Sequence, residues 1–333
     1  MKHTLLILFI IPAYLFSQTN SKKVFFSKNS PLSEKSITAI ATDSTGLNWI
    51  GTLEGLICYN GQRWITLNTE NSKLPSDKIL CIAIENNTKY IGTTEGLLVI
   101  KNNNWKVFKT TNSRLPSNKI RKIKISKGVV WIATSAGLVR YKNNFNVMLS
   151  KEKNSITNDD FITLCVDNNE MIWVGTNDGL YSFKEGIWKV FTTENSQLPN
   201  NHIWSIIVDS EDKKWIGTKN GLVAITNEGW QLFDKKNSIL ESNRINSIVC
   251  DDYDRIWVST TKGVISYDGD SWKKQKTKIC RKEVITSLFI DAFDNKWICT
   301  LNNIILFNTE GVEFKNNITI ENSVIVSREE SKE

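Results

Sequence analysis

The chain has 333 residues, of which 40% are hydrophobic, and this is enough apolar material to bury the core of a globular protein. Its formal net charge of +7 is spread along the sequence, and no basic stripe with interleaved aromatic residues occurs, so the composition argues against a nucleic-acid-binding protein. The six cysteines form no CxxC pair and no repeated spacing; we therefore expect small buried hydrophobic residues rather than a zinc site or a disulfide framework.

Residues 1–18 are predicted to be a signal peptide. Lys2 is followed by an apolar run from Leu5 to Phe16 and then by Ser17 and Gln18, which is the pattern of a secretory signal. No other run approaches the roughly 20 apolar residues needed to span a bilayer. We therefore expect a periplasmic or secreted protein that does not span the membrane.

Residues 19–36 form an N-terminal segment that resembles the end of a repeat. Lys23 to Phe26, followed by Asn29 and Ser30, matches the last strand and exit of later units, such as the stretch that begins at Lys106. We expect this segment to be a ring-closing strand, with residues 312–316 as the competing candidate for the same place.

Residues 37–316 repeat one phrase seven times. The phrase reads WIGT-xx-GL with small variations, and its first residues are Trp49, Tyr90, Trp131, Trp173, Trp215, Trp257 and Trp297. These anchors are 40 to 42 residues apart, a period typical of solenoids, propellers or arrays. A second tryptophan follows fifteen positions after five of the anchors, and it is replaced near Phe145 in the third unit and near Val312 in the seventh.

Each unit is predicted to contain four short antiparallel strands, because its residues alternate, are rich in Ile, Val, Trp and Thr, and are bounded by Asn, Asp and Gly clusters. In the fifth unit we expect strands at 202–209, 214–218, 221–225 and 230–234. The first is apolar on both faces, so each small sheet must be covered on both sides by other sheets. The predicted fold is all-β, a seven-bladed β-propeller of four-stranded antiparallel blades, with an open β-solenoid as the alternative. Residues 317–333 are expected to be a C-terminal tail.

The order of these elements is that of a known repeat. The units show an inner strand of the form IxxIxxD, then [WY]-[IV]-G-T-xx-G-[LV], an aromatic residue fifteen positions on, and NSxLPS. This order resembles the two-component regulator propeller repeat over residues 37 to about 315. The resemblance implies an exported sensor-type propeller that responds to polysaccharide fragments. Because this chain shows one propeller and neither a membrane helix nor a kinase, signalling implies a separate sensor kinase as partner.

Candidate functional residues are those that break the repeat. Of the twelve tryptophans, only Trp204 is neither an anchor nor at the second recurring position, and His202, two residues before it, is the only histidine after the predicted signal peptide. Both stand where the fifth innermost strand begins. The face where these strands begin, here called the channel mouth, carries the predicted ligand-binding residues Lys78, Lys119, Arg121, Asp160, His202, Trp204, Arg244 and Asn246. A basic rim with an aromatic plate suits an anionic sugar or a carboxylated ligand.

We expect a protein without catalytic residues, metal or cofactor that binds an oligosaccharide at the channel mouth. One alternative is a scaffold that docks an envelope protein, which an extended apolar patch would favour. Another is a polysaccharide lyase that uses His202 as base, with Lys119, Arg121 or Arg244 neutralising a uronate. The Asp-rich turns, such as 251–254, invite a comparison with Ca²⁺ loops, but they lack the terminal glutamate, and turn formation explains them.

Overall fold

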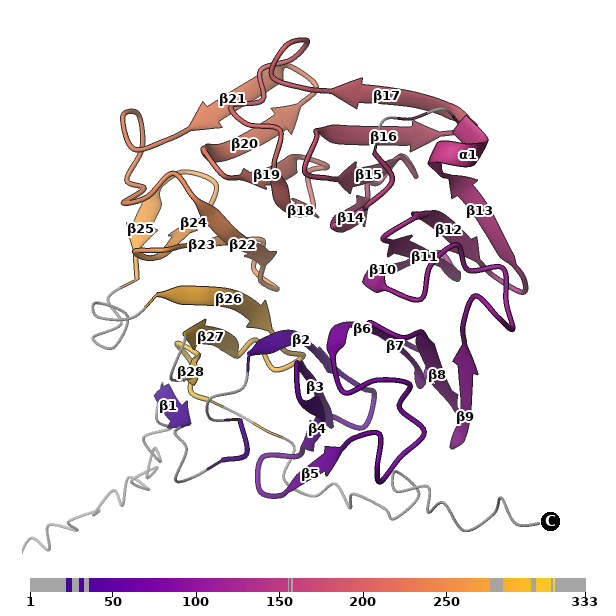
Figure 1. The fold of residues 1–333 in the computed structure, drawn as a ribbon. Coiled ribbons are helices and arrows are strands. Elements are labelled where there is room, and N and C mark those ends of the chain that lie inside the picture. The colour runs from indigo at the N-terminus through magenta and orange to yellow at the C-terminus, as the bar shows by residue number, and fades with distance from the viewer. Residues whose placement is uncertain are drawn as a thin grey trace, which may run out of the picture.

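Seven four-stranded antiparallel sheets form a closed ring in the computed structural model, as the sequence predicts (Figure 1). The structure describes residues 22–25, 30–32, 36–154, 156, 158–275, 284–300, 304–312 and 314. The predicted signal peptide, the predicted tail and Cys280 lie outside the described residues. The helix α1 (Lys151–Asn154) follows the third sheet, and no helix in the described ranges is long and apolar enough to cross a bilayer.

Each sheet, or blade, runs from an innermost strand at the centre of the ring to an outer strand at its edge. The innermost strands are β2 (Ile37–Thr42), β6 (Ile79–Glu85), β10 (Ile120–Ser126), β14 (Thr163–Val166), β18 (Ile203–Val208), β22 (Ile245–Cys250) and β26 (Ile285–Ile290). The second strands are β3 (Asn48–Thr52), β7 (Thr88–Thr93), β11 (Val129–Thr134), β15 (Ile172–Gly175), β19 (Lys214–Thr218), β23 (Ile256–Thr260) and β27 (Lys296–Thr300).

The third strands are β4 (Gly55–Tyr59), β8 (Leu97–Lys101), β12 (Gly137–Tyr141), β16 (Leu180–Lys184), β20 (Gly221–Thr226), β24 (Gly263–Tyr267) and β28 (Ile304–Phe307). The outer strands are β5 (Trp64–Leu67), β9 (Asn104–Phe108), β13 (Phe145–Leu149), β17 (Ile187–Phe191), β21 (Gly229–Phe233), β25 (Trp272–Lys274) and β1 (Lys22–Phe25). In the fifth blade, the bounds of the four observed strands lie within one residue of the predicted bounds.

The seventh blade joins the two ends of the described chain. Its strand order is β1-β28-β27-β26, and β1 pairs antiparallel with β28, with Lys22 opposite Phe307. The N-terminal segment therefore supplies the outer strand. From the competing segment, Val312 and Phe314 pack instead against the hydrophobic cluster between the seventh and first blades. Contacts between β2 and β26 complete the ring.

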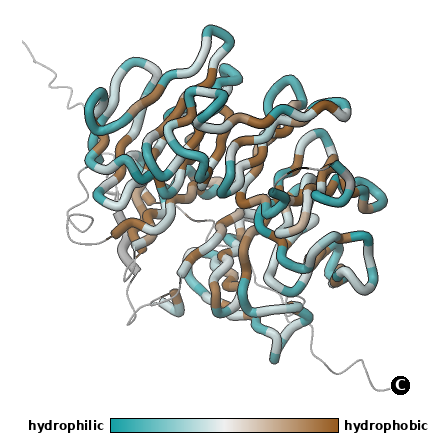
Figure 2. Tube along the Cα trace, turned by 45° about the horizontal axis from the view of Figure 1, so that its top comes forward, coloured by the Kyte–Doolittle hydropathy of each residue, from teal (hydrophilic) through white to brown (hydrophobic). Residues whose placement is uncertain are grey.

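The core consists of seven hydrophobic seams, one between each pair of neighbouring blades. Trp215 packs with Ile245 and Ile248 of the next blade, whereas Ile216, beside it in β19, packs in the seam with the preceding blade. The anchor is therefore wedged between adjacent blades. Figure 2 shows the result along the chain, with hydrophobic residues concentrated in the strands and hydrophilic residues in the loops. Close approach of the blades excludes a side chain at Gly217, where an added Cβ would lie 2.7 Å from Ile245 Cγ2.

In five of the blades the anchor tryptophan donates a hydrogen bond to an aspartate. In the sixth, Asp251 Oδ1 accepts hydrogen bonds from the backbone N–H groups of Tyr253 and Arg255, and its Oδ2 accepts one from Trp257 Nε1 at 2.8 Å. The same Trp–Asp bond recurs at Asp43, Asp167, Asp209 and Asp291. These carboxylate oxygens shape the turn and orient the anchor, which supports turn formation as the reason for the Asp-rich sequence.

Three seams are bridged by a lysine that immediately precedes the anchor and reaches a carboxylate of the preceding blade. The Nζ to Oδ2 distances are 3.3 Å for Lys89 and Asp43, 3.2 Å for Lys214 and Asp167, and 3.4 Å for Lys296 and Asp251. In the first blade Asn48 takes the lysine position, and its buried Nδ2 has no hydrogen-bond partner among the described residues.

Candidate functional site

The channel mouth is shaped by a β-bulge near the start of the innermost strand. In six blades the pairing of the innermost and second strands slips by one residue, and the extra residues are Thr38, Leu80, Arg121, Trp204, Asn246 and Thr286. A bulge leaves one residue outside the ladder and re-aims its side chain. The strict alternation of a regular strand, assumed in the sequence argument, therefore does not hold at these positions.

Five of these six bulged residues, all but Thr286, line the central channel, a cavity of about 510 Å³ that all seven innermost strands border. Arg121, Trp204 and Asn246 belong to its lining, together with Lys122 and Lys124 of β10. The described lining contains no carboxylate. Lys122 and Lys124 make the lining positive, because the third cation, Arg121, is paired with Asp160 and the other lining residues are uncharged.

His202, Trp204 and Arg244 form one cluster at the channel mouth. The rings of His202 and Trp204 stack with centroids 4.5 Å apart, and the Arg244 guanidinium carbon lies 5.6 Å from the Trp204 ring centroid. Partial burial, together with the charges of Lys219 and Arg244, lowers the pKa of His202, which favours the neutral imidazole. The Trp204 indole N–H is buried and has no hydrogen-bond partner among the described residues.

The other predicted residues are Arg121, Asp160 and Asn246, whose side chains have polar partners, and Lys78 and Lys119. Arg121 and Asp160 form a bidentate ion pair across neighbouring blades, with Nε to Oδ1 at 2.8 Å and Nη2 to Oδ2 at 2.6 Å, so they neutralise each other. Asn246 donates from Nδ2 to the Ile285 carbonyl of the next blade at 2.6 Å. Lys78 is exposed and Lys119 half-buried, and neither lines the channel. Of the predicted lysines and arginines, only Arg121 lines the channel.

Two cationic residues were missed by the sequence argument, which considered only the first positions of each innermost strand. Lys122 and Lys124 line the channel, and neither has an ion pair among the described residues. Burial within the channel lowers the pKa of Lys122, and the charge of Lys124 acts in the same direction. Comparison of the repeats could have found both lysines, because in β18 the same register positions are Ser205 and Ile207.

The cysteines described are all unpaired thiols. Cys58, Cys81, Cys165 and Cys299 are buried and Cys250 is half-buried, and burial raises the pKa of each of these thiols. A thiol whose pKa is raised by apolar surroundings is a poor nucleophile and a poor metal ligand. Within the described ranges, no three His, Cys, Asp or Glu side chains group closely enough to hold a metal ion.

Comparison with known proteins finds solved structures that share this fold. The sequence profile described as "two component regulator propeller" matches residues 239–262, which contain β22 and β23. No curated protein matches the chain by sequence. Among solved structures, the extracellular domain of a protein assigned as a hybrid two component system in B. thetaiotaomicron superposes with a TM-score of 0.73 at 20% identity, over 86% of this chain and 41% of that one.

Two further structures show how widely this fold is used. A second B. thetaiotaomicron extracellular domain, from a protein assigned as a one component system, gives a TM-score of 0.68 at 21% identity, over 82% of this chain and 38% of that one. Virginiamycin B lyase from Staphylococcus aureus gives a TM-score of 0.66 at 13% identity, over 86% of this chain and 98% of that one. This chain thus spans about two fifths of the length of the sensor structures, and identities this low show the fold alone. The chain is a seven-bladed propeller in which residues 239–262 match the two component regulator propeller repeat.

Proposed function

We propose that this chain is an exported, non-enzymatic recognition propeller that binds an anionic ligand, with an acidic oligosaccharide as the leading class, at the channel mouth. The observation that carries the proposal is the positive channel beside Trp204. Lys122 and Lys124 have no ion pair within the described residues, and the described lining holds no carboxylate that would neutralise them. A carboxylate or sulfate would supply the missing charge through charge-assisted hydrogen bonds.

Trp204 supports the same ligand class through its ring and its N–H group. A buried donor without a partner costs about 1–3 kcal/mol, so a ligand oxygen that accepts from Nε1 would relieve that cost. The Arg244 guanidinium beside the ring is exposed and can bind a carboxylate in a bidentate manner. Stacking and hydrogen bonding together suit a sugar that bears an acidic group.

A scaffold that docks another envelope protein is less well supported by the surface of the ring. The large hydrophobic side chains exposed in the described part are Leu53, Ile187, Val190, Tyr253 and Val284. They lie on four different blades, and only Val284 stands at the start of an innermost strand. A recessed, polar cavity favours a small ligand over a flat protein partner.

Export and signalling also belong to the proposal. The sensor structures that resemble this chain are extracellular domains of two-component or one-component systems. A propeller of this type would report ligand binding to a sensor kinase. The predicted signal peptide is consistent with the periplasm or the exterior as the place of binding.

The test is binding of a uronate oligosaccharide, tetragalacturonate, to the purified mature protein by calorimetry, with a fully methyl-esterified form as the neutral probe. Trp204→Ala should weaken binding at least tenfold, about 1.4 kcal/mol, with little change in melting temperature. Leu80→Ala, at the equivalent bulge position in the second blade, is the matched control and should bind normally. Equal loss in both variants, or unfolding of Trp204→Ala, would overturn the assignment. Unsaturated ends appearing on the polymer would replace it with the lyase alternative.

A further inference from the structure

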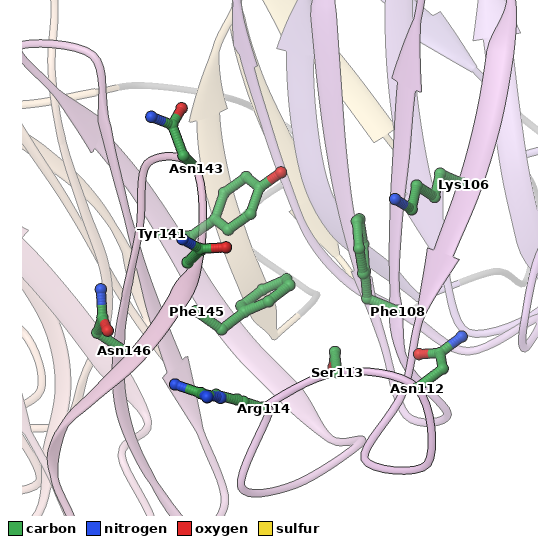
Figure 3. Close-up of a pocket in the computed structure, with 10 residues that line it drawn as sticks. Lys106, Phe108, Asn112, Ser113, Arg114, Tyr141, Asn143, Phe145 and Asn146 are labelled. Carbon is green, nitrogen blue, oxygen red and sulfur yellow. The ribbon is translucent and has the colours of Figure 1, made fainter.

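A second cavity opens at the outer edge of the ring, at the seam between the second and third blades (Figure 3). Its volume is about 480 Å³, within the range of roughly 300–1,000 Å³ found for small-ligand sites. One wall comes from β9 and the loop that follows it. The other comes from β12, β13 and the turn between them. The cavity is separate from the central channel, because the two share no lining residue.

The cavity coincides with a break in the repeat. Phe145 pairs with Tyr141 in the position where Trp272 pairs with Tyr267 in the sixth blade. Its ring meets Phe108 of the preceding blade at 5.0 Å, as Trp230 meets Phe191 at 5.4 Å two seams further on. A phenyl ring is smaller than an indole, so this substitution leaves space at the second seam that a tryptophan would fill.

The lining combines positive charge with amide groups. Lys106 and Arg114 are both exposed and approach the cavity from different sides (Figure 3). Asn143, Asn144 and Asn146 are exposed, and none of their side chains has a hydrogen bond within the described residues. The described lining contains no carboxylate. These groups therefore remain available to a ligand that brings both negative charge and hydroxyl groups.

The floor and one wall are held in place by internal contacts. Tyr141 and Phe145 lie with ring centroids 4.5 Å apart and form the apolar floor. Asn112 Nδ2 donates to the Val107 carbonyl at 3.1 Å, and Ser113 Oγ donates to the Lys109 carbonyl at 2.6 Å, so the loop that carries Arg114 is fixed. A preformed site of this kind loses little conformational freedom when it binds.

We infer that this cavity, here called the seam pocket, binds an acidic sugar unit. The carboxylate or sulfate of the sugar contacts Arg114 and Lys106, its hydroxyl groups bond to the free asparagine amides, and one apolar face of the sugar ring rests on Tyr141 and Phe145. This inference does not depend on the channel site. One polymer with regularly spaced acidic groups would have two independent places of contact on the same ring.

The experiment uses the Trp204→Ala protein, so that the channel site contributes little. Tetragalacturonate, its fully methyl-esterified form and a sulfated disaccharide are titrated in turn. We expect an acidic probe to bind and the esterified form to bind at least tenfold more weakly. Phe145→Trp, which restores the tryptophan of the other blades, and Arg114→Ala should each reduce binding of that acidic probe at least tenfold.

The matched controls lie at the seam of the fourth and fifth blades, where Lys189 and Gln197 take the sequence positions of Lys106 and Arg114. Lys189→Ala and Gln197→Ala should leave binding unchanged. Arg114 is exposed, so its variant keeps the test valid if Phe145→Trp disturbs folding. Normal binding by a folded Arg114→Ala protein, or no binding by either acidic probe, would overturn the seam pocket without affecting the channel assignment.

Discussion

The aspartate that follows an innermost strand has a lysine beside it at some seams and none at others. Burial opposes ionisation of Asp43, but hydrogen bonds from Thr45 and Trp49 and the charge of Lys89 outweigh it and lower its pKa. At the closing seam burial raises the pKa of Asp291, and hydrogen bonds from Asn295 and Trp297 offset this only in part. The difference follows from Asn48, which stands where three of the other seams have a lysine.

We predict that Asn48→Lys strengthens the closing seam. A lysine there would give Asp291 the ion pair that Asp43 and Asp251 already have, and it would remove a buried amide without a partner. The gain in the free energy of unfolding should be about 1 kcal/mol or more, measured by urea denaturation. The reciprocal variant, Lys89→Asn, leaves Asp43 without its cation and should lose about 3 kcal/mol. A loss of stability in Asn48→Lys would show that the seam cannot hold the ammonium group.

His202 makes binding at the channel mouth dependent on pH. Its folded-state pKa lies below the ordinary value of 6.5, because of burial first and then the charges of Lys219 and Arg244. Folding therefore releases a proton between the two pKa values, and the stability that His202 contributes is lost as pH falls below about 6.5. A bound anion favours the imidazolium, so we expect tetragalacturonate to bind more tightly at pH 5.5 than at pH 7.5. His202→Gln should abolish most of this dependence in calorimetric titrations.

At the scale of elements, β10 is distinguished from the other innermost strands by its two lysines. Their equivalents are small or apolar, as in Ser205 and Ile207 of β18. Both lysines line a channel whose described lining has no carboxylate, and neither forms an ion pair among the described residues, which is why we assign these lysines to ligand binding. The strand itself is otherwise regular beyond its bulge.

We predict that the double variant Lys122→Ser, Lys124→Ile, which copies β18, reduces tetragalacturonate binding at least tenfold and flattens its dependence on salt. Screening by salt weakens contacts between charges, so loss of the lysines should remove that sensitivity. Titrations at two salt concentrations measure this, and urea denaturation should show stability equal to or above that of the parent protein. An unchanged salt dependence would mean that the channel does not bind the anion.

The strands and turns could be predicted because each follows from local sequence. Anchors, glycines and Asp-rich turns recur with the period of the blades, and Lys214–Thr218 was predicted to the residue. The bulges could not be predicted, because the repeat pattern gives the alternation of a regular strand and does not mark where the pairing slips by one residue. The Arg121–Asp160 pair joins neighbouring blades and required their relative placement. The space beside Phe145 depends on packing at one seam, although the missing tryptophan marked the place.

At the scale of the whole molecule, ring closure depends on a four-residue strand. β1 adds the outer strand to a blade whose other three strands come from the far end of the sequence. Without it β28 would present a row of unpaired backbone groups, and exposed strand edges promote aggregation. Closure through both ends also makes the seventh blade the one that holds the ring together.

We predict that a protein beginning at Ser30 melts at least about 3 °C below one beginning at Thr19. The shorter protein should also aggregate more readily on heating, which light scattering would detect. Removal of residues 317–333 is the control and should change neither property. Equal melting temperatures for the proteins beginning at Ser30 and Thr19 would mean that pairing of β1 with β28 contributes little.

The pairing of Lys22–Phe25 with Ile304–Phe307 also fixes the order in which the molecule can be completed. During synthesis the first strand leaves the ribosome roughly 280 residues before its partner, so six blades can form while it waits. Until Ile304–Phe307 have been synthesised, the new chain is an incomplete ring. Only a chain that extends to Phe307 can make this pairing, so a copy that ends before Ile304 cannot close the ring in this way.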